Sequence, residues 1–353
     1  MQPLYTILLF FLSITGLNHL AVASADDDCL TPRQATEVPP ASFSRAPFAA
    51  KPEFSFQDGT NQLEIFYAGK RIATYLKSHP HLSRRALVNV HSLHGNQVTR
   101  NFPARAPQDI DPGHPDKQRI IHPYMHPGIW VSYGDLSGND YWRLQAKVKF
   151  DSWMNRPTAK NQAGTFSAKN LFLSQNGKTV VCQELSHYRF KIIDAGLLLL
   201  IDVEYKSDQN DFYFGDQEES GLAIRVASPI RVVGGNGTIL NQQGERNGKS
   251  IWGKNSGWFD YSGTIHDRQV GIMVAANPEN FRPSWLHARD YGLVATNPFP
   301  KQPRERREPY RKTPVKKGET LTLSWALLVH DHPRDQLLDR KAIYNQLLKQ
   351  WAR

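Results

Sequence analysis

The chain has little cysteine, no long apolar run beyond its first residues, and none of the compact motifs that mark common enzyme classes. Its two cysteines exclude a disulfide-stapled miniprotein and a metal site built from cysteine alone. The sequence has no phosphate-cradling glycine-rich loop, no dinucleotide fingerprint, no Gly-x-Ser-x-Gly elbow and no His-Glu-x-x-His segment. With 24 glycines and 23 prolines spread along 353 residues, a coiled coil or a plain helical bundle is excluded as well.

What remains is the composition of a basic globular protein. Hydrophobic residues make up 40 % and aromatic residues 11 % of the chain, which is enough to close a core. Lys and Arg number 43 against 33 Asp and Glu, so the formal charge is +10 and anionic partners are favoured over cationic ones. The length fits one large domain or two modest ones.

The first 25 residues read as an export signal. An apolar run at 7–12 is followed by Ala23-Ser24-Ala25, the small-x-small pattern at which signal peptidases cut. Thr15 and Asn18 interrupt the run before it could span a bilayer, and no later segment could do so. We therefore predict cleavage after Ala25 and a secreted or periplasmic protein.

An irregular arm is predicted at residues 26–50, rich in Ala, Ser and Pro. It contains Cys29, and the second cysteine is Cys182. A compartment outside the cytoplasm permits a disulfide between them, and two unrelated buried thiols are the alternative.

Short alternating apolar segments separated by turn residues predict a chain made mainly of strands. Residues 63–67 and 71–75 flank a short turn, which indicates a hairpin. The run from Leu197 to Ile201 is apolar at consecutive positions, so this strand should be covered on both faces. Further strands are predicted at 54–56, 86–92, 143–150, 179–190, 196–205, 221–233, 269–275 and 320–330.

One helix signal is strong, and it lies at the end of the chain. Apolar residues recur at a spacing of three to four between Leu337 and Trp351, after Pro333. We therefore predict an all-β fold, a large antiparallel β-sandwich of jelly-roll or supersandwich-like form, with a C-terminal α-helix. The predicted organisation after the signal and arm is a single sandwich domain at 51–332 and the helix at 333–353.

The first segment that could carry chemistry runs from His122 to Trp142. Prolines and a glycine around His126 exclude a helix there, and loops on rigid β scaffolds commonly hold sites. His126 can act as acid, base or metal ligand near neutral pH, Trp130 can stack on a sugar ring, and Asp135 follows. The alternative is a core tryptophan beside hydrogen-bonded turn histidines.

The second segment is acidic and precedes a strand. Asp216, Glu218 and Glu219 lie within four residues, an arrangement that requires solvent, a cation or a shared proton. Alternation in the following strand places Arg225 on the face opposite its apolar neighbours, where it could pair with these acids or with a substrate carboxylate. A solvated acidic turn with a salt bridge is the alternative.

The third segment, residues 277–299, combines amides, an imidazole, a guanidinium, a phenol and a tryptophan. Sugars present hydroxyl edges and apolar ring faces, and such side chains can bind both. A buried polar network that stabilises a long loop is the alternative. The candidates are Asn280, Trp285, His287, Arg289, Tyr291 and Asn297.

Together these segments resemble a bacterial family of unknown function, DUF6807. Its members show a Met-His-Pro-Gly-(Leu/Ile)-Trp segment, matched here at 125–130, and a Gly-Asp-x-x-Gly-x-Asp-(Phe/Tyr)-Trp-Arg segment, matched at 134–143. Similar runs match at 218–222 and 285–299, and the similarity covers residues 85–332. Where other members have adjacent histidines, this chain has a single His126, which does not favour a two-histidine metal site.

The resemblance implies a β-sandwich and a carbohydrate context. The family is also labelled "methane oxygenase PmoA", which implies an integral membrane subunit, and the sequence has no segments to form one. We therefore do not adopt that label.

The favoured hypothesis is a secreted carbohydrate-active enzyme, a glycoside hydrolase or lyase acting on an extracellular sugar chain. His126 or His287 would transfer protons, Glu218 or Glu219 would act as acid or base, and Arg225 and Arg289 would stabilise negative charge. Trp130 and Trp285 would form a sugar platform. The predicted catalytic residues are His126, Glu218, Glu219, Arg225, His287, Arg289 and Tyr291; the predicted substrate-binding residues are Trp130, Asp135, Asn280, Trp285 and Asn297.

Two other functions stay open. One is a non-catalytic carbohydrate-binding or surface module, and the other is a metal-dependent oxidoreductase using His122, His126 and a carboxylate. The sequence requires no cofactor, leaves a divalent metal open, and predicts a carbohydrate partner, anionic ones included, with no nucleic acid and no membrane span. Convergence of His126, Glu219, Arg225, His287 and Arg289 in one pocket would favour the enzyme, and their failure to meet in one pocket would favour the binding module.

Overall fold

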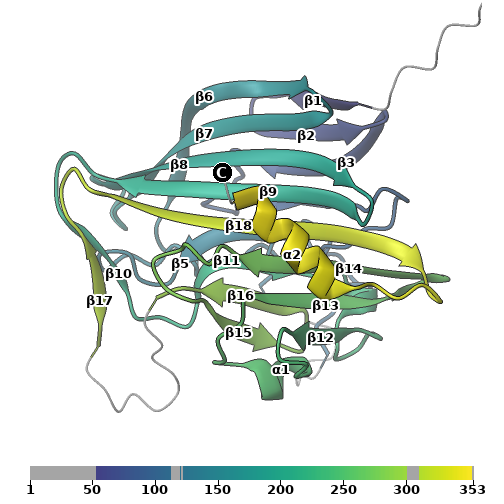
Figure 1. The fold of residues 1–353 in the computed structure, drawn as a ribbon. Coiled ribbons are helices and arrows are strands. Elements are labelled where there is room, and N and C mark those ends of the chain that lie inside the picture. The colour runs from purple at the N-terminus through teal and green to yellow at the C-terminus, as the bar shows by residue number, and fades with distance from the viewer. Residues whose placement is uncertain (1–52, 113–119, 121, 300–309, 352–353) are drawn as a thin grey trace, which may run out of the picture. The chain divides into compact units, whose positions relative to one another are not determined.

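Two large antiparallel sheets dominate the computed structural model, which describes residues 53–112, 120, 122–299 and 310–351 (Figure 1). Sheet I has the strand order β1-β2-β3-β4-β5-β11-β16-β15, and sheet II the order β12-β13-β14-β18-β9-β8-β7-β6. A small third sheet pairs β10 with β17. The predicted all-β sandwich with a C-terminal helix is confirmed. The predicted signal peptide and arm, with Cys29, lie outside the described residues.

The element bounds follow the chain in order. Sheet I comprises β1 (Phe54–Asp58), β2 (Gln62–Tyr67), β3 (Lys70–Leu76), β4 (Ala86–Val88), β5 (Ile129–Tyr133), β11 (Ser220–Arg225), β15 (Trp285–Arg289) and β16 (Leu293–Asn297). Sheet II comprises β6 (Val148–Lys160), β7 (Ala163–Leu173), β8 (Val180–Ile193), β9 (Gly196–Lys206), β12 (Thr238–Asn241), β13 (Trp258–Ile265), β14 (Arg268–Ala276) and β18 (Thr320–Pro333). The remaining elements are β10 (Phe212–Gly215), β17 (Lys312–Val315), the 3₁₀ turn η1 (Ser228–Ile230), α1 (Asn247–Ile251) and α2 (Arg340–Trp351). None of the helices found in the described ranges is both long and apolar enough to cross a membrane.

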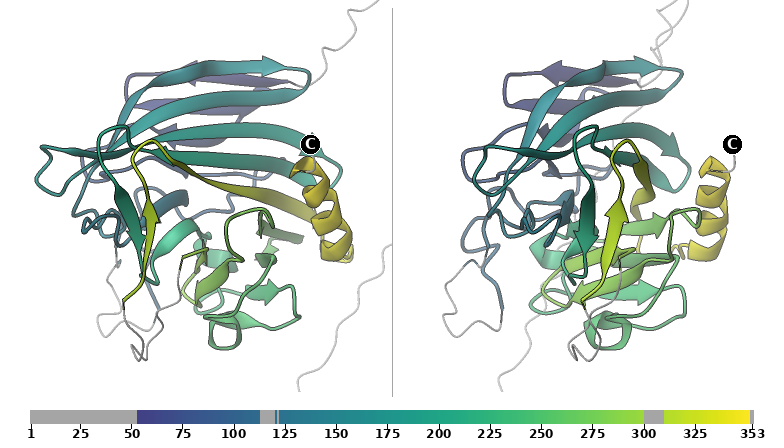
Figure 2. Two further views of the ribbon diagram at one scale, coloured as in Figure 1. Left: turned by 60° about the vertical axis from the view of Figure 1, so that its left-hand side comes forward. Right: turned by 90° about the vertical axis from the view of Figure 1, so that its left-hand side faces the viewer.

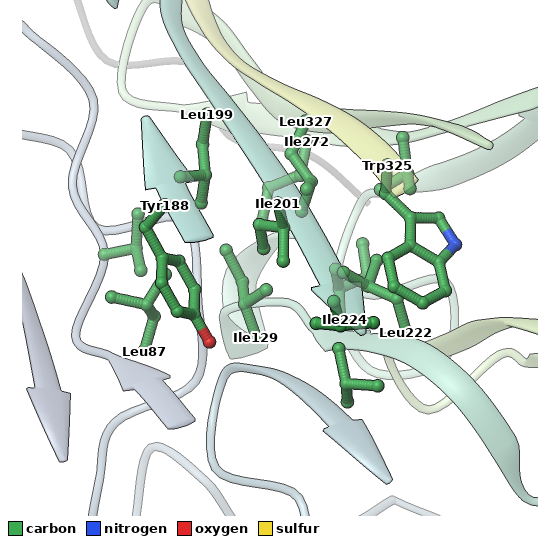
Figure 3. Close-up of a cluster of buried hydrophobic side chains, with 14 of the residues drawn as sticks. Leu87, Ile129, Tyr188, Leu199, Ile201, Leu222, Ile224, Ile272, Trp325 and Leu327 are labelled. Atoms are coloured by element: carbon green, nitrogen blue, oxygen red, sulfur yellow. The ribbon is translucent and has the colours of Figure 1, made fainter. Parts of the chain in front are cut away.

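The main hydrophobic core lies between the two sheets. It is formed by the alternate side chains of each strand that point inward, as expected for packed antiparallel sheets. In β11, Leu222 and Ile224 point into this core while Arg225 points to the other face, as predicted. Figure 3 shows side chains of the two sheets meeting: Leu87, Ile129, Leu222 and Ile224 from sheet I, and Tyr188, Leu199, Ile201, Ile272, Trp325 and Leu327 from sheet II.

Helix α2 lies along the outside of sheet II (Figures 1 and 2). It explains the consecutive apolar run of β9, because Leu198 and Leu200 pack beneath Ile343 and Leu347 while the intervening residues face the core. The helix begins at Arg340 rather than just after Pro333, which is the last residue of β18. The carboxylate of Asp339, which accepts a hydrogen bond from the Ala342 N–H at 2.9 Å, supplies the N-terminal cap.

Several strand predictions had the wrong bounds. The strand predicted at 143–150 begins at Val148, because the preceding residues form a turn in which the N–H groups of Gln145 and Ala146 bond the Asp140 carbonyl. The segment 221–233 leaves the strand after Arg225 and continues into η1. Strands β15 and β16 were missed. In β16 the outward-facing Leu293 and Ala295 are as apolar as the inward-facing Val294, so the alternating pattern of a half-buried strand is lost.

A buried ion pair joins the two sheets inside this core. Arg85, just before β4, is 2 % exposed and its guanidinium binds the carboxylate of Glu184 in β8, which is fully buried. Tyr205 donates to the same carboxylate at 2.7 Å and Asn170 at 3.0 Å. Because the acid is saturated with donors, the charge is tolerated between the sheets.

Replacing Glu184 by Gln should lower the free energy of unfolding by about 3–5 kcal/mol, since Arg85 would stay charged in the core without its counterion. Urea denaturation measures this loss. The matched control is Glu64→Gln, which removes the partner of the half-exposed Arg71 and should cost no more than about 1 kcal/mol. Equal losses in the two variants would contradict a structural role for the buried pair.

Candidate functional site

The outer face of sheet I, turned away from the core, carries most of the predicted site residues. In register across four strands lie Trp130 of β5, Ala223 of β11, Ala295 of β16 and His287 of β15. The next row sets Arg225 beside Leu293 and then Arg289. Neighbouring strands lie about 4.8 Å apart, so the backbones of Arg225 and Arg289 are about 10 Å apart on this face.

The loop that carries His126 is held against this face by backbone contacts that require a glycine. Gly128 accepts a hydrogen bond from the Arg225 N–H at 2.7 Å. A Cβ at Gly128 would lie 2.5 Å from the carbonyl oxygen of Leu87, so a larger residue would push the loop away from β4.

Arg84 also holds this loop in place through hydrogen bonds to backbone carbonyl groups. Its guanidinium donates to the carbonyl of Tyr141 at 2.8 Å, to that of Trp142 at 2.7 Å, and to that of Met125. It is 1 % exposed, and burial lowers its pKa to about 9. An arginine that satisfies three carbonyl groups in the interior fixes the residue next to His126 in space.

The imidazole of His126 lies in an aromatic stack. Its ring is nearly parallel to that of Trp130, with centroids 5.6 Å apart, and to that of Tyr291, with centroids 6.2 Å apart. It is 3 % exposed, yet no residue in the described parts of the chain forms a hydrogen bond with it. A buried imidazole normally has a partner, so this ring is positioned to meet a group that enters from the pocket beside it.

That pocket, which we call the histidine pocket, has a volume of about 110 Å³. The guanidinium of Arg225 lies in its wall, 4.5 Å from the centre of the Tyr291 ring. Its lining residues are Asp111, Pro112, His122, His126, Arg225 and Tyr291.

Burial and cationic neighbours keep the His126 ring neutral. Removal from solvent is the largest effect and the Arg225 guanidinium the next, and together they hold the pKa of His126 well below its ordinary value of 6.5. Burial also raises the pKa of Tyr291, so its phenol keeps its proton. At neutral pH the pocket therefore offers a proton acceptor and a proton donor side by side.

Arginine and aspartate organise the other side of the histidine pocket. Asp111 accepts from Arg225 at 2.6 Å and from Arg100 at 3.4 Å. Arg100 also donates a hydrogen bond to the carbonyl of His122 at 3.3 Å, which connects it to the loop that carries His126, here called the histidine loop.

A second cluster lies two strands away on the same face. Glu218 binds Arg289 at 3.1 Å, and its other oxygen lies 3.7 Å from Nδ1 of His287. Arg289 lies 5.9 Å from the ring of Trp252, and both line a hollow of about 270 Å³. The predicted site residues therefore do not meet in one pocket. His126, Arg225 and Tyr291 share the histidine pocket, while Glu218, His287 and Arg289 form a neighbouring group.

The remaining predicted polar residues lie elsewhere. Glu219 points away and binds Arg143. Asp135 accepts from the Gly138 N–H of its own turn at 2.7 Å and from the Tyr310 hydroxyl.

The side-chain amides of Asn280 and Asn297 form hydrogen bonds with backbone groups. Asn280 exchanges hydrogen bonds with the backbone of Ser324 at 2.8 and 3.0 Å, which fastens its loop to sheet II. Asn297 donates to the carbonyl of Gln217 at 2.7 Å and so supports the residue before Glu218. Neither amide lines the histidine pocket.

The predicted sugar platform is not formed by the expected tryptophans. Trp130 and Trp285 are each 2 % exposed, the first beneath His126 and the second bonded to the Phe299 carbonyl at 3.1 Å. Neither ring presents an open face, because loops cover this side of sheet I. Trp252, which is not among the predicted site residues, is only partly buried and lines two adjoining hollows.

Sequence reasoning also missed Arg84, Arg100 and Asp111. Their signal was weak, because arginines and aspartates are usually solvated and nothing in the local pattern marks these three as buried. Within the described residues no three His, Cys, Asp or Glu side chains are grouped closely enough to hold a metal ion. The predicted set of His122, His126 and a carboxylate is therefore not formed there as a metal site.

Comparisons with known proteins agree with the resemblance seen in the motifs. The model of a family of unknown function, DUF6807, matches residues 62–342. No curated protein matches the chain.

Several solved structures align with this chain at low TM-scores. The galactosidase domain of alpha-galactosidase-sucrose kinase AgaSK aligns with a TM-score of 0.40 at 9 % identity, over 79 % of this chain and 40 % of that one, so this chain spans less than half of that protein. A galactose mutarotase-like protein from Lactobacillus casei aligns with a TM-score of 0.34 at 11 % identity, over 79 % and 100 %. One from Clostridium acetobutylicum aligns with a TM-score of 0.33 at 7 % identity, over 79 % and 94 %. These similarities are too distant to indicate an activity.

NMR titration of the histidine ring should show His126 still neutral at pH 6, because its pKa lies well below 6.5. In Arg225→Met the pKa should rise toward 6.5, since a neighbouring positive charge is removed, while the matched control Arg189→Met on sheet II should leave it unchanged. A His126 that titrates at 6.5 or above in the unaltered protein would contradict the buried, cation-flanked geometry.

Proposed function

The chain belongs to the DUF6807 family, and from the geometry of the histidine pocket we propose that it is a secreted carbohydrate-active enzyme whose reaction begins with removal of a proton from the sugar. The observation that carries this proposal is the His126 imidazole. It is neutral, almost fully buried, without a hydrogen-bond partner in the described residues, and set beside a guanidinium. A general base must be unprotonated at the operating pH and able to reach the proton that it removes, and the neutral, unpartnered His126 ring beside the pocket meets both conditions.

Elimination fits this pocket better than hydrolysis. Glycoside hydrolysis commonly uses two carboxyl groups about 5–10 Å apart. The described lining of the pocket has one carboxylate, Asp111, and it is held by Arg225 and Arg100. Glu218 and Glu219, the predicted acid and base, bind Arg289 and Arg143 instead. A His, Tyr and Arg set without a carboxylate pair suits a lyase.

The reaction can be written with the residues in place. His126 accepts a proton from a sugar carbon next to a carbonyl or carboxyl group, and Arg225 stabilises the negative charge that develops there. The bond from the neighbouring carbon to the glycosidic oxygen breaks, a carbon–carbon double bond forms, and Tyr291 donates its proton to the leaving oxygen. One C–H and one C–O bond are lost, and the product is an unsaturated sugar with a new chain end.

The hollow beside Arg289 supports a sugar chain as the substrate. Trp252 supplies a partly exposed aromatic surface there, and Lys249, Arg289 and Asp290 supply polar groups. Apolar ring faces and hydroxyl edges of sugars are bound by such mixed surfaces. The hollow lies at the β15 edge of sheet I, and Arg289 in its lining also binds Glu218, so a sugar chain in the hollow would meet this cluster.

The test is a screen of the purified protein against neutral polysaccharides, acidic polysaccharides and oxidised glycosides. Unsaturated product is followed by ultraviolet absorbance and new chain ends by a reducing-sugar assay. His126→Asn should lower kcat/KM by about 10²- to 10⁴-fold, the usual contribution of a general base. The matched control His187→Asn, on the outer face of sheet II, should keep full activity.

The outcomes separate the candidate functions. New reducing ends without unsaturation would show hydrolysis and overturn the elimination. Binding without turnover by the unaltered protein would indicate the non-catalytic module. Equal turnover by the unaltered protein and His126→Asn would remove His126 from the mechanism.

A further inference from the structure

Buried arginines outnumber buried carboxylates around the histidine pocket. Four guanidiniums surround it, each no more than 6 % exposed, while the buried acids among the described residues there are two, Asp109 and Asp111. Removing unbalanced charge from water is costly, so an excess of buried cations favours an anion at their centre. The four arginines are Arg84, Arg100, Arg225 and Arg231.

Each of the two carboxylates already has partners among the described residues. Asp109 accepts from Ser228, from Asn101 and from the Arg105 N–H, so its oxygens serve loop structure. Asp111 alone is shared between Arg225 at 2.6 Å and Arg100 at 3.4 Å.

The other two arginines are held by backbone carbonyls. Arg84 donates to three of them, and Arg231 donates to that of Ile110 at 2.9 Å. Nε and Nη1 of Arg231 are buried without a hydrogen-bond partner among the described residues. Among the described residues, this guanidinium is therefore only partly satisfied by hydrogen bonds.

Building on the proposed function, we propose that the substrate is a hexuronate-containing sugar whose carboxylate binds Arg225 in the histidine pocket, in exchange with Asp111. Asp111 lines the pocket and occupies the guanidinium as an internal carboxylate. A volume of about 110 Å³ admits a carboxyl group and part of the ring that bears it. Arginine is well suited to this exchange because it binds carboxylates through directed, charge-assisted hydrogen bonds.

A substrate carboxylate bound at this position would also provide the acidic proton that His126, as the proposed base, removes. In a hexuronate the carbon that bears the carboxyl group is C5, and pairing of the carboxyl group with Arg225 makes the C5 proton more acidic. His126 takes that proton, the C4–O4 bond breaks, the C4–C5 double bond forms, and the Tyr291 proton goes to O4. A sulfate ester would satisfy the charge without activating the C5 proton, so the reaction singles out the carboxylate.

Calorimetric titration of the full chain with matched sugars tests this inference. Glucuronate or galacturonate should bind roughly 10- to 100-fold more tightly than glucose or galactose, as expected for hydrogen bonds to a charged group. Arg225→Gln should remove that preference, and the control Arg189→Gln on sheet II should keep it. Asp111→Asn should bind the uronates several-fold more tightly than the unaltered protein, because the internal competitor is weakened, without a gain for the neutral sugars.

These results test recognition of the substrate carboxylate, and they can be told apart from failure of the proposed enzyme function. Equal affinity for acidic and neutral sugars overturns the carboxylate, even if turnover still depends on His126. Binding of glucose 6-sulfate as tight as that of glucuronate shows recognition of charge alone and overturns the hexuronate assignment. An unchanged uronate affinity in Asp111→Asn, with an unfolding curve like that of the unaltered protein, overturns the exchange. Loss of the enzyme hypothesis is recognised instead by turnover that survives His126→Asn.

Discussion

Two consecutive buried arginines hold together the parts of this protein on which the rest depends. Arg84 and Arg85 lie just before β4, and their side chains reach opposite sides of sheet I: Arg84 binds the carbonyl groups under the His126 loop and Arg85 binds Glu184 in the core. Arg85 enters the core and binds Glu184 of sheet II, which joins the two layers. Arg84 reaches the outer face and binds the carbonyl of Met125, the residue before His126. One dipeptide therefore fixes both the sandwich and the loop of the candidate site.

The outer face of sheet I shows how a β-sheet can present chemistry while remaining covered. The small side chains of Ala223 and Ala295 at the centre of this face leave space for the histidine loop, which lies over them. The coverage removes His126 from water, and removal from water is the main reason that its ring stays neutral. The same burial raises the energetic cost of the surrounding guanidiniums, so the proposed proton acceptance and the proposed anion recognition would share one physical origin.

The sequence predicted the local parts of this arrangement well. Prolines and glycine around His126 indicated a constrained loop before a strand, and alternation in β11 placed Arg225 opposite the core. The consecutive apolar run in β9 correctly indicated two covered faces. The errors came where burial depends on distant segments. Trp130 and Trp285 were expected to be open, but other parts of the chain cover them, whereas the partly buried Trp252 was not among the predicted binding residues.

By itself, the amino-acid order determined the β class, the terminal helix and the family, and it pointed to the loops of the candidate site, because alternation, turn residues and short motifs act over a few positions. The tertiary structure alone decided which charges meet. It paired Asp111 with Arg225, 114 residues further along the chain, and separated the adjacent Glu218 and Glu219 onto different arginines. Such pairings arise from strand order and from the desolvation that packing imposes, and neither is written in any local pattern of residues.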